Sequence, residues 1–337
     1  MRFETITIKD IAKALGLSTS TVSRALRGGY EISEETKRIV LEYAEKINYR
    51  PNPIAQSLKE RRSHSIGVVV CEIANYFFSQ AINGIESIAY DSGYHVIITQ
   101  SNEMHDREVL NVEHLASRSV DGLLISLSSE SADISYLKSL HEKGLPIVLF
   151  DRVTDEIITH KVTANNFAGA FEATEHLINM GNKHIAHVTN AGHLSVTRER
   201  LEGYKEALKK HNIPYNEDYV KFCNYSSGMQ EAIDSSIKTL LELDKPPQAL
   251  FIAQDKLSTG CLLALKKINT PLAKNMVIAG FTNSNVADLF TPPIISIRQP
   301  AFEMGQLATQ LLIQLIESKY PVTEFETKVL NTKLITH

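Results

Sequence analysis

Residues 7–26 are TIKDIAKALGLSTSTVSRAL, and their pattern predicts two short helices joined by a tight turn. From Ile8 onward, apolar residues recur at spacings of three and four, which places them on one face of a helix. Thr7 is placed to cap this helix, with Asp10 as the acidic partner of a capping box. Gly16 then supplies the left-handed residue that ends the helix.

Two further helices complete this N-terminal module. Ser18 caps the second, residues 19–26, and Ser33 caps the third, roughly residues 33–46. We expect the third helix to bury Ile39, Val40, Tyr43 and Ala44. This arrangement is the helix-turn-helix pattern, whose second helix can lie in the major groove of DNA. Spacing alone is a weak signal, because a small helical bundle with a solvated Ser/Thr face has the same pattern.

The outer face of the second helix suits contact with bases. It carries the short polar side chains of Thr19, Ser20 and Ser23, with Arg24 beside them. An arginine fork can donate two hydrogen bonds to guanine, and hydroxyl groups can contact base edges or phosphates.

Four segments occur together in this region: TIKDIA at residues 7–12, STSTVSRAL at 18–26, SEETK at 33–37 and NYRPN at 48–52. The combination closely resembles the lactose-repressor (LacI) family of bacterial transcription regulators. The base-contacting residues that the resemblance implies are Thr19, Ser20 and Arg24. The implied contacts with the DNA backbone are those of Thr21, Ser23 and Asn52. The helix caps Thr7 and Ser18 complete the predicted DNA-binding set of this module.

The segment of residues 51–63 is expected to be a hinge helix and linker. Pro53 suits the first position of a short helix, which is too short to be stable alone in water. A plain domain linker is the alternative. The family resemblance implies a hinge helix that folds on operator DNA in a dimer. Leu58 would then insert into the minor groove and kink the duplex, and Ala55 would pack against its symmetry mate.

From residue 65 onward, apolar strand-like segments alternate with helical ones. The predicted strands are residues 66–71, 94–100, 122–126, 146–150, 184–189, 220–222, 249–252, 277–281 and 295–297. Repeated strand–helix units imply doubly wound parallel sheets, with ligands at the carboxyl ends of the strands. About 270 residues are too many for one such sheet, so two lobes with a cleft between them are expected.

The family resemblance continues through this region. The segments that carry it include GIE at residues 84–86, VDGLLI at 120–125, IVLFDR at 147–152, ERLEGY at 199–204, QD at 254–255, AGF at 279–281, QP at 299–300 and MG at 304–305. The resemblance implies the fold of periplasmic sugar-binding proteins. We therefore predict an all-α helix-turn-helix DNA-binding domain at residues 1–50. An α/β two-lobed, periplasmic-binding-protein-like domain for effector binding and dimerisation follows at residues 64–337.

The resemblance also implies which residues bind the effector. The predicted effector contacts are Asn75, Tyr76, Phe77, Asp151, Arg152, Arg200 and Asp255. Two of them have an alternative interpretation, Asp151 as a strand-end cap and Arg200 as an interlobe salt bridge. Asn165 and Thr282 stand where the family commonly has aspartates, and we include them in the site. The effector is then either less hydroxyl-rich than a typical sugar or itself anionic, such as a uronate or sugar phosphate.

Charge and composition agree with two unlike parts. The whole chain has a net charge of −4, but residues 1–63 hold 12 Lys and Arg against 8 Asp and Glu, a net of +4. The remaining residues hold 23 against 31, a net of −8. A basic module attached to an acidic one suits a partner that binds only the basic part, such as DNA. Three scattered cysteines and no secretory signal or membrane-length apolar run predict a cytoplasmic protein.

No sequence motif supports catalysis, a cofactor or a metal site, so we expect no enzyme and neither kind of group. The predicted partners are a pseudo-palindromic operator DNA, a carbohydrate-derived small-molecule effector and a second copy of the chain, with no membrane. Alternatives are regulation by a nucleobase or a phosphoprotein, a solute-binding receptor, and a sugar-modifying enzyme. The sequence does not distinguish an inducer from a co-repressor.

Overall fold

The computed structural model describes residues 6–28, 31–49, 62–131, 133–223, 228–284 and 294–336. The chain falls into two compact units, Met1–Ser63 and His64–His337. We call them the head and the body. None of the described helices is both long and apolar enough to cross a membrane.

The head is a bundle of three helices, as predicted. They are α1 (Ile8–Leu15), α2 (Thr19–Leu26) and α3 (Glu34–Lys46). The Asp10 carboxylate accepts hydrogen bonds from the backbone N–H and the hydroxyl of Thr7, and Gly16 ends α1 with a φ of +65°. Ser18 and Ser33 cap the next two helices by accepting hydrogen bonds from the backbone N–H groups three residues later.

One expectation for the head is wrong. Ile39 was expected in the core, but its side chain is 41% exposed. The buried face of α3 consists of Val40 and Ala44, which pack with Ile11 and Val22 of the two shorter helices. Because those helices are only eight residues long, they cover a narrow stripe of α3 and leave the neighbouring row of Ile39 in contact with solvent. The predicted hinge residues Asn52, Ala55 and Leu58 lie outside the described residues.

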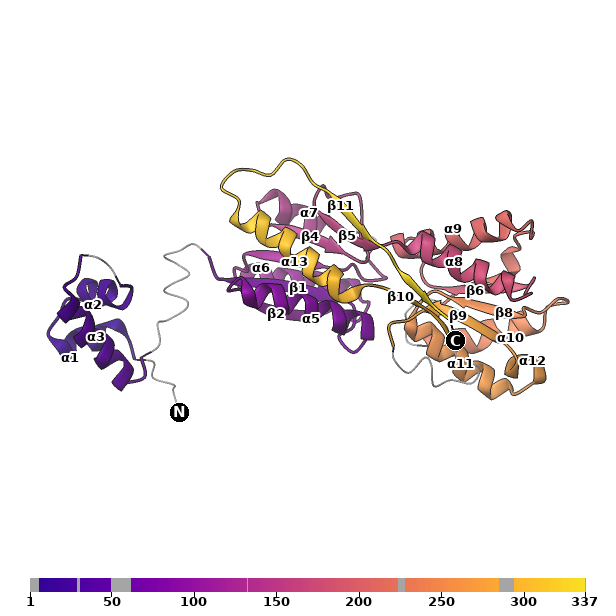
Figure 1. The fold of residues 1–337 in the computed structure, drawn as a ribbon, viewed down its shortest axis with the longest axis horizontal. Helices are drawn as coiled ribbons and strands as arrows, with labels where there is room; N and C mark the ends of the chain where they lie inside the picture. Colours follow the sequence, from indigo (N-terminus) through magenta and orange to yellow (C-terminus); the bar gives the residue numbers. More distant parts are fainter. Residues whose placement is uncertain are drawn as a thin grey trace. The chain divides into compact units, whose positions relative to one another are not determined.

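The body has two lobes, each built on a six-stranded sheet (Figure 1). The sheet of the first lobe is parallel throughout and has the order β11-β5-β4-β3-β1-β2. Its strands are β1 (Ser65–Val70), β2 (His95–Gln100), β3 (Gly122–Ile125), β4 (Ile147–Phe150), β5 (Lys161–Ala164) and β11 (Thr327–Leu330). Its helices are α5 (Tyr76–Asp91), α6 (His105–Ser117), α7 (Ser135–Glu142) and α13 (Ala301–Glu317). The first and last of these cover one face of the sheet, and α6 and α7 cover the other.

The sheet of the second lobe has the order β12-β10-β9-β8-β6-β7, with only β12 antiparallel to its neighbour among the described strands. Its strands are β6 (Ile185–Thr189), β7 (Val220–Phe222), β8 (Ala249–Ile252), β9 (Val277–Phe281), β10 (Ile295–Arg298) and β12 (Lys333–Ile335). Its helices are α8 (Asn166–Asn179), α9 (Ser195–Lys210), α10 (Met229–Leu241), α11 (Asp255–Ile268) and α12 (Pro271–Lys274). The helices α8 and α9 pack on one face, and α10, α11 and α12 pack on the other.

The chain passes between the two lobes three times. It crosses from β5 to α8, from β10 to α13 and from β11 to β12. In Figure 1, the yellow stretch that begins at β11 runs from the first lobe to the C-terminus in the second lobe and shows one of these crossings. As a result, the carboxyl ends of the parallel strands of both sheets meet between the lobes, where ligands of such folds bind.

Candidate functional site

The start of α2 presents the predicted DNA-contacting face. Thr19 and Ser20 are exposed there. The Ser18 hydroxyl accepts a hydrogen bond from the backbone N–H of Thr21 at 3.0 Å and lies 2.7 Å and 2.8 Å from the hydroxyls of Ser20 and Thr21. Ser18 and Thr21 therefore shape the start of the helix. The Thr19 side chain is exposed, so its hydroxyl is more accessible to a partner than those of Ser18 and Thr21.

Arg24 lies one turn further along α2, and its side chain is 60% exposed. Its guanidinium forms an ion pair with Glu31 at 3.2 Å, and the Glu31 side chain is also exposed. An exposed pair of this kind contributes little to stability and exchanges readily, so the guanidinium can move to another acceptor. Ser23, beside it on the helix, is half-buried.

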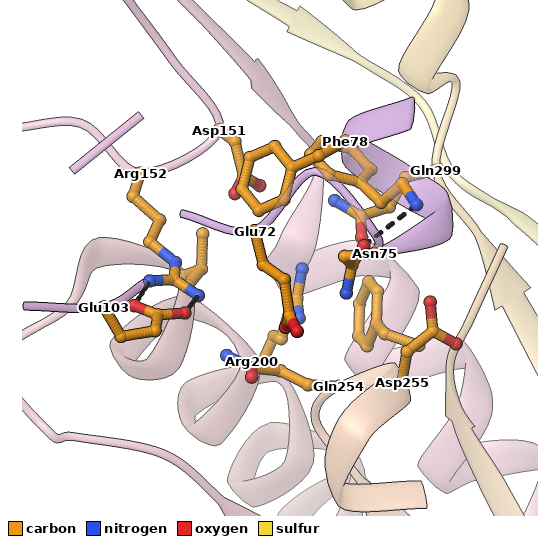
Figure 2. Close-up of a pocket in the computed structure, with 13 residues that line it drawn as sticks. Glu72, Asn75, Phe78, Glu103, Asp151, Arg152, Arg200, Gln254, Asp255 and Gln299 are labelled. Carbon is orange, nitrogen blue, oxygen red and sulfur yellow. Dashed lines mark hydrogen bonds and ion pairs between the residues drawn. The ribbon is translucent and has the colours of Figure 1, made fainter. Parts of the chain in front are cut away.

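In the body, a pocket lies between the lobes at the carboxyl ends of the strands (Figure 2). It encloses about 490 Å³ of space, part of it open to solvent. The residues that line it are Glu72, Asn75, Phe77, Phe78, Glu103, Asp151, Arg152, Val196, Arg200, Gln254, Asp255, Phe281 and Gln299. Six of the nine predicted effector contacts line it: Asn75, Phe77, Asp151, Arg152, Arg200 and Asp255.

The first strand positions the residues at the start of α5. Asn75 caps this helix, because its side-chain oxygen accepts a hydrogen bond from the N–H of Phe77 at 2.9 Å. Phe77 and Phe78 are both buried and lie edge to face, with ring centroids 5.2 Å apart. Tyr76 is 41% exposed and does not line the pocket, because it lies on the opposite side of the first turn of α5.

Arg152 is already bonded within its own lobe. Its guanidinium donates to both carboxylate oxygens of Glu103, at 2.6 Å and 2.9 Å, and to the carbonyl of Leu127. Burial alone raises the pKa of Glu103, but the charge and hydrogen bonds of Arg152, together with the hydrogen bond from the Ser129 N–H, hold that pKa below its usual range. This buried pair forms part of the pocket wall, and its hydrogen bonds occupy much of the fork that was expected to contact the effector.

Arg200 lies within α9, in the second lobe, and is almost completely buried. Its Nε and Nη2 donate to the side-chain oxygen of Asn166 at 2.9 Å and 2.7 Å, and its Nη1 donates to the carbonyl of Ala253. The guanidinium also stacks 3.7 Å from the ring centroid of Phe281. Burial lowers the pKa of Arg200 to about 10, so the group is still charged at neutral pH. These hydrogen-bond partners belong to its own lobe, so they do not form the alternative interlobe salt bridge.

Asp151 and Asp255 face the pocket from opposite lobes. Asp151 follows β4 with a φ of +60°, and Asp255 begins α11. Burial raises the pKa of both carboxyl groups, although nearby arginines partly offset it. The Thr282 side chain and the Asn283 backbone also lower the pKa of Asp255 and so offset part of the effect of burial.

Besides Tyr76, two predicted residues lie outside this pocket for identifiable reasons. Thr282 is buried and its hydroxyl accepts a hydrogen bond from the N–H of Ser284, while Asn165 caps α8 by accepting a hydrogen bond from the N–H of Ala168. The lining residues that the sequence prediction missed are Glu72, Phe78, Glu103, Val196, Gln254, Phe281 and Gln299. Three of these, Gln254, Phe281 and Gln299, occur in segments that carry the family resemblance, which was the available signal.

Several polar contacts join the lobes around the pocket. Lys256 Nζ lies 3.1 Å from the carboxylate of Glu72 across the cleft. The Asn283 amide donates to the side-chain oxygen of Gln80, on α5, at 2.6 Å. No group of His, Cys, Asp and Glu residues suited to hold a metal ion occurs in the described part of the chain.

Comparison with known families agrees with this division into head and body. A family model described as "Bacterial regulatory proteins, lacI family" matches residues 7–52. A second, described as "Periplasmic binding proteins and sugar binding domain of LacI family", matches residues 63–337. The chain belongs to the LacI family. It is therefore a DNA-binding transcriptional regulator of that family, as the N-terminal motif indicated.

Several known transcriptional regulators match almost the full length of the chain. It is 32% identical to the probable HTH-type transcriptional regulator EndR of Paenibacillus polymyxa, over 93% of this chain and 91% of that one. It is 29% identical to the HTH-type transcriptional repressor PurR of Vibrio cholerae, over 93% and 92%. Among solved structures, the complex of the transcriptional regulator CelR with cellobiose superposes with a TM-score of 0.71 at 26% identity, and the match covers 98% of each chain.

Proposed function

We propose that this LacI-family repressor binds operator DNA through α2 as a homodimer, and that a neutral sugar in the interlobe pocket sets its DNA affinity. The observation that carries the proposal is the set of charged, amide and aromatic side chains that converge between the lobes. A ligand that contacts both lobes stabilises one relative orientation of the lobes over others. It thereby changes how the paired heads meet DNA.

The charges in the pocket favour a neutral effector. Among the described lining residues, Glu103 and Arg152 neutralise each other, and Glu72 is paired with Lys256 at the rim. These four groups add no net charge. An incoming ligand therefore meets mainly the charged groups deeper in the pocket.

Those deeper groups are Asp151, Asp255 and Arg200, so two negative charges face one positive charge. Carboxylates are strong acceptors for ligand hydroxyls, whereas they repel a second anion in a site of low dielectric constant. The rings of Phe77 and Phe281 supply an apolar surface for the face of a sugar ring. This excess of negative charge argues against an anionic effector such as a uronate or sugar phosphate. Such an effector is the expectation drawn from Asn165 and Thr282, which stand where the family commonly has aspartates. The cellobiose bound by the related CelR also supports a neutral sugar.

Exposed apolar side chains support the homodimer. Ile98 on β2, Leu110 on α6, Phe222 on β7 and Leu263 on α11 are 37–50% exposed. The strands β2 and β7 are the terminal strands of their sheets, at the ends opposite β11 and β12. An apolar surface along this side of both lobes suits a second copy of the chain.

A thermal-shift screen of the full-length protein tests the effector class. We expect a neutral mono- or disaccharide to raise the melting temperature in a concentration-dependent way, because ligands that bind only the native state stabilise it. Uronates, sugar phosphates and nucleobases serve as comparison sets. If the largest shift comes from an anionic sugar or a nucleobase, the proposal of a neutral sugar is wrong.

The role of α2 can be tested with an operator obtained by selection from random DNA. Arg24→Gln should cost about 1–3 kcal/mol of operator affinity and relax selectivity at one base pair of each half-site. Arg38→Gln is a matched control, because Arg38 is an equally exposed arginine on α3 that is paired with Glu42. Equal losses for the two variants would remove Arg24 from the base-contacting set.

A further inference from the structure

A second cavity lies between the lobes, beside the crossing from β5 to α8. It encloses about 1900 Å³ of space, much of it open to solvent, and shares only Arg152 with the lining of the interlobe pocket. The contact between the Val153 N–H and the Ser195 hydroxyl, at 3.3 Å, joins the lobes at its wall. The cavity lies at the β11 side of the body, away from the terminal strands β2 and β7. Dimerisation along those strands would leave it accessible.

The buried polar groups of this cavity include several hydrogen-bond donors. Lys161 and Thr163 project into it from β5 and are 8% and 6% exposed. Ser195 lies at the first turn of α9, a 16-residue helix whose N-cap, Leu194, provides no side-chain cap. Its first N–H groups therefore add a partial positive charge near the cavity. Asn165 adds an amide from the start of α8.

The acidic side chain that is paired with Lys161 is exposed to solvent. Asp155 is fully exposed and forms an ion pair with the buried Lys161. The hydrogen bond and charge of Lys161, with the charge of Arg198, lower the pKa of Asp155, so both cations act on the same carboxylate. Because Asp155 lies in solvent, its carboxylate can leave Lys161 at little cost.

Two other carboxylates line the cavity and are engaged elsewhere. Glu156 forms an ion pair with Lys138 at 2.6 Å. Glu199 accepts a hydrogen bond from the Asn166 amide at 3.0 Å. Once Asp155 is displaced, Lys161 and Arg198 lose the carboxylate on which both act, and Arg198 keeps the hydrogen bond from its Nη1 to the His193 carbonyl at 3.0 Å.

We infer that this cavity is a second ligand site, which takes a small organic phosphate in the place of the Asp155 carboxylate. The phosphate would accept hydrogen bonds from Lys161 and Arg198 and lie near the start of α9. The organic part of the ligand would contact Phe167 and Val329, which line the same cavity and are 42% and 56% exposed. The site is separate from the sugar pocket and does not depend on the identity of the effector bound there.

Isothermal titration calorimetry of the full-length protein at constant ionic strength tests this site, with glycerol 3-phosphate as the probe and glycerol as its neutral counterpart. We expect saturable binding of glycerol 3-phosphate only. Lys161→Met should weaken it about tenfold or more, because a buried charge-assisted hydrogen bond is lost. Asp155→Asn should strengthen it several-fold, because the competing internal anion is removed. This exposed substitution leaves the fold intact, so it tests the site even if Lys161→Met does not fold.

Two controls separate this site from other anion binding. Lys205→Gln changes an exposed lysine on α9 that pairs with Glu202, and it should leave the affinity unchanged. Arg200→Met changes the sugar pocket and should also leave it unchanged. The inference fails if neither wild type nor Asp155→Asn binds the probe saturably at 10 mM, a concentration that still detects weak complexes of about millimolar affinity. It also fails if binding is lost with Arg200→Met but kept with Lys161→Met.

Discussion

At the scale of single residues, Asp255 shows a conflict between stability and ligand binding. Its carboxyl group is buried and its pKa is raised, mainly by that burial. A folded-state pKa above the unfolded value means that the folded state holds the proton more tightly. The stability contribution is therefore largest at low pH and is lost as the pH rises through the folded pKa. At neutral pH the ionised carboxylate is retained at a cost to stability.

We therefore expect Asp255→Asn to raise the melting temperature at pH 7 by a few degrees and to abolish the effector-induced shift. The stabilisation should disappear as the pH falls to about 4, near the unfolded pKa of aspartate, because the wild-type carboxyl group is then neutral as well. Thermal unfolding of both proteins between pH 4 and 8 measures this difference. A lower melting temperature for Asp255→Asn at pH 7 would contradict the interpretation.

In the pair of Glu103 and Arg152, the carboxyl pKa is shifted in the opposite direction from that of Asp255. The pKa of Glu103 is lowered, so its stabilising contribution is present above the unfolded pKa and is lost as the pH falls through the folded one. Arg152→Met leaves the carboxylate buried without its partner and should destabilise the body by about 3–5 kcal/mol in urea unfolding at pH 7. Adding Glu103→Gln should restore part of this loss, because the uncompensated charge is removed. Equal stability of the single and double variants would contradict the ion-pair account.

The site could be predicted from the sequence only where residues stood in recognisable segments. Asp151, Arg200 and Asp255 follow strands or lie in helices within such segments, and all three line the pocket. Glu72 and Glu103 lie in loops with no distinctive pattern. Their place at the pocket follows from the sheet order, which the sequence does not specify.

At the scale of elements, the contact between α5 and α13 explains two segments that carried the family resemblance. A Cβ atom on Gly84 would lie 2.0 Å from the carbonyl oxygen of Phe302, and one on Gly305 would lie 2.1 Å from that of Ala81. The two helices therefore touch backbone to backbone, which only glycine permits at these positions.

Gly84→Ala should accordingly lower the free energy of unfolding by about 3 kcal/mol or more, at or beyond the upper end for overpacked cores, because backbone atoms must move. Gly192→Ala is the matched control, since its Cβ would meet only the Phe222 ring at 3.6 Å. We expect it to change stability by no more than about 0.5 kcal/mol. Urea unfolding of the full-length protein measures both, and similar values for the two variants would contradict the close contact.

Most strands of the body, with helices between them, were predicted because their apolar spacing is regular, and the predicted strand bounds agree to within one residue. The exceptions are β5, β11, β12 and the short helix α12. The strand β5 has only four residues, among them lysine and threonine, and β11 and β12 alternate polar and half-buried residues at sheet edges. These segments become strands because the fold brings β5 beside β4, β11 beside β5 and β12 beside β10, a long-range effect that local patterns do not contain.

At the scale of the whole molecule, the charge is divided between the two units. The positive head suits the DNA phosphates, and the acidic body would be repelled by them. In the proposed function, the effector binds the body and acts on the geometry of the heads. The interlobe contacts of Lys256 with Glu72 and of Asn283 with Gln80 are the points at which lobe closure can be favoured or opposed. Linkage requires that an effector that weakens operator binding also bind less tightly to the DNA-bound protein.

The most direct test of this account is a fluorescence-anisotropy titration of selected operator DNA with the full-length protein, with and without the sugar that gives the largest thermal shift. We expect saturating sugar to change the operator Kd by at least about fivefold, the lower end of typical allosteric coupling. Arg200→Met should bind the operator normally and show no change with the sugar. An operator Kd that is the same with and without saturating sugar in the wild-type protein would contradict the account.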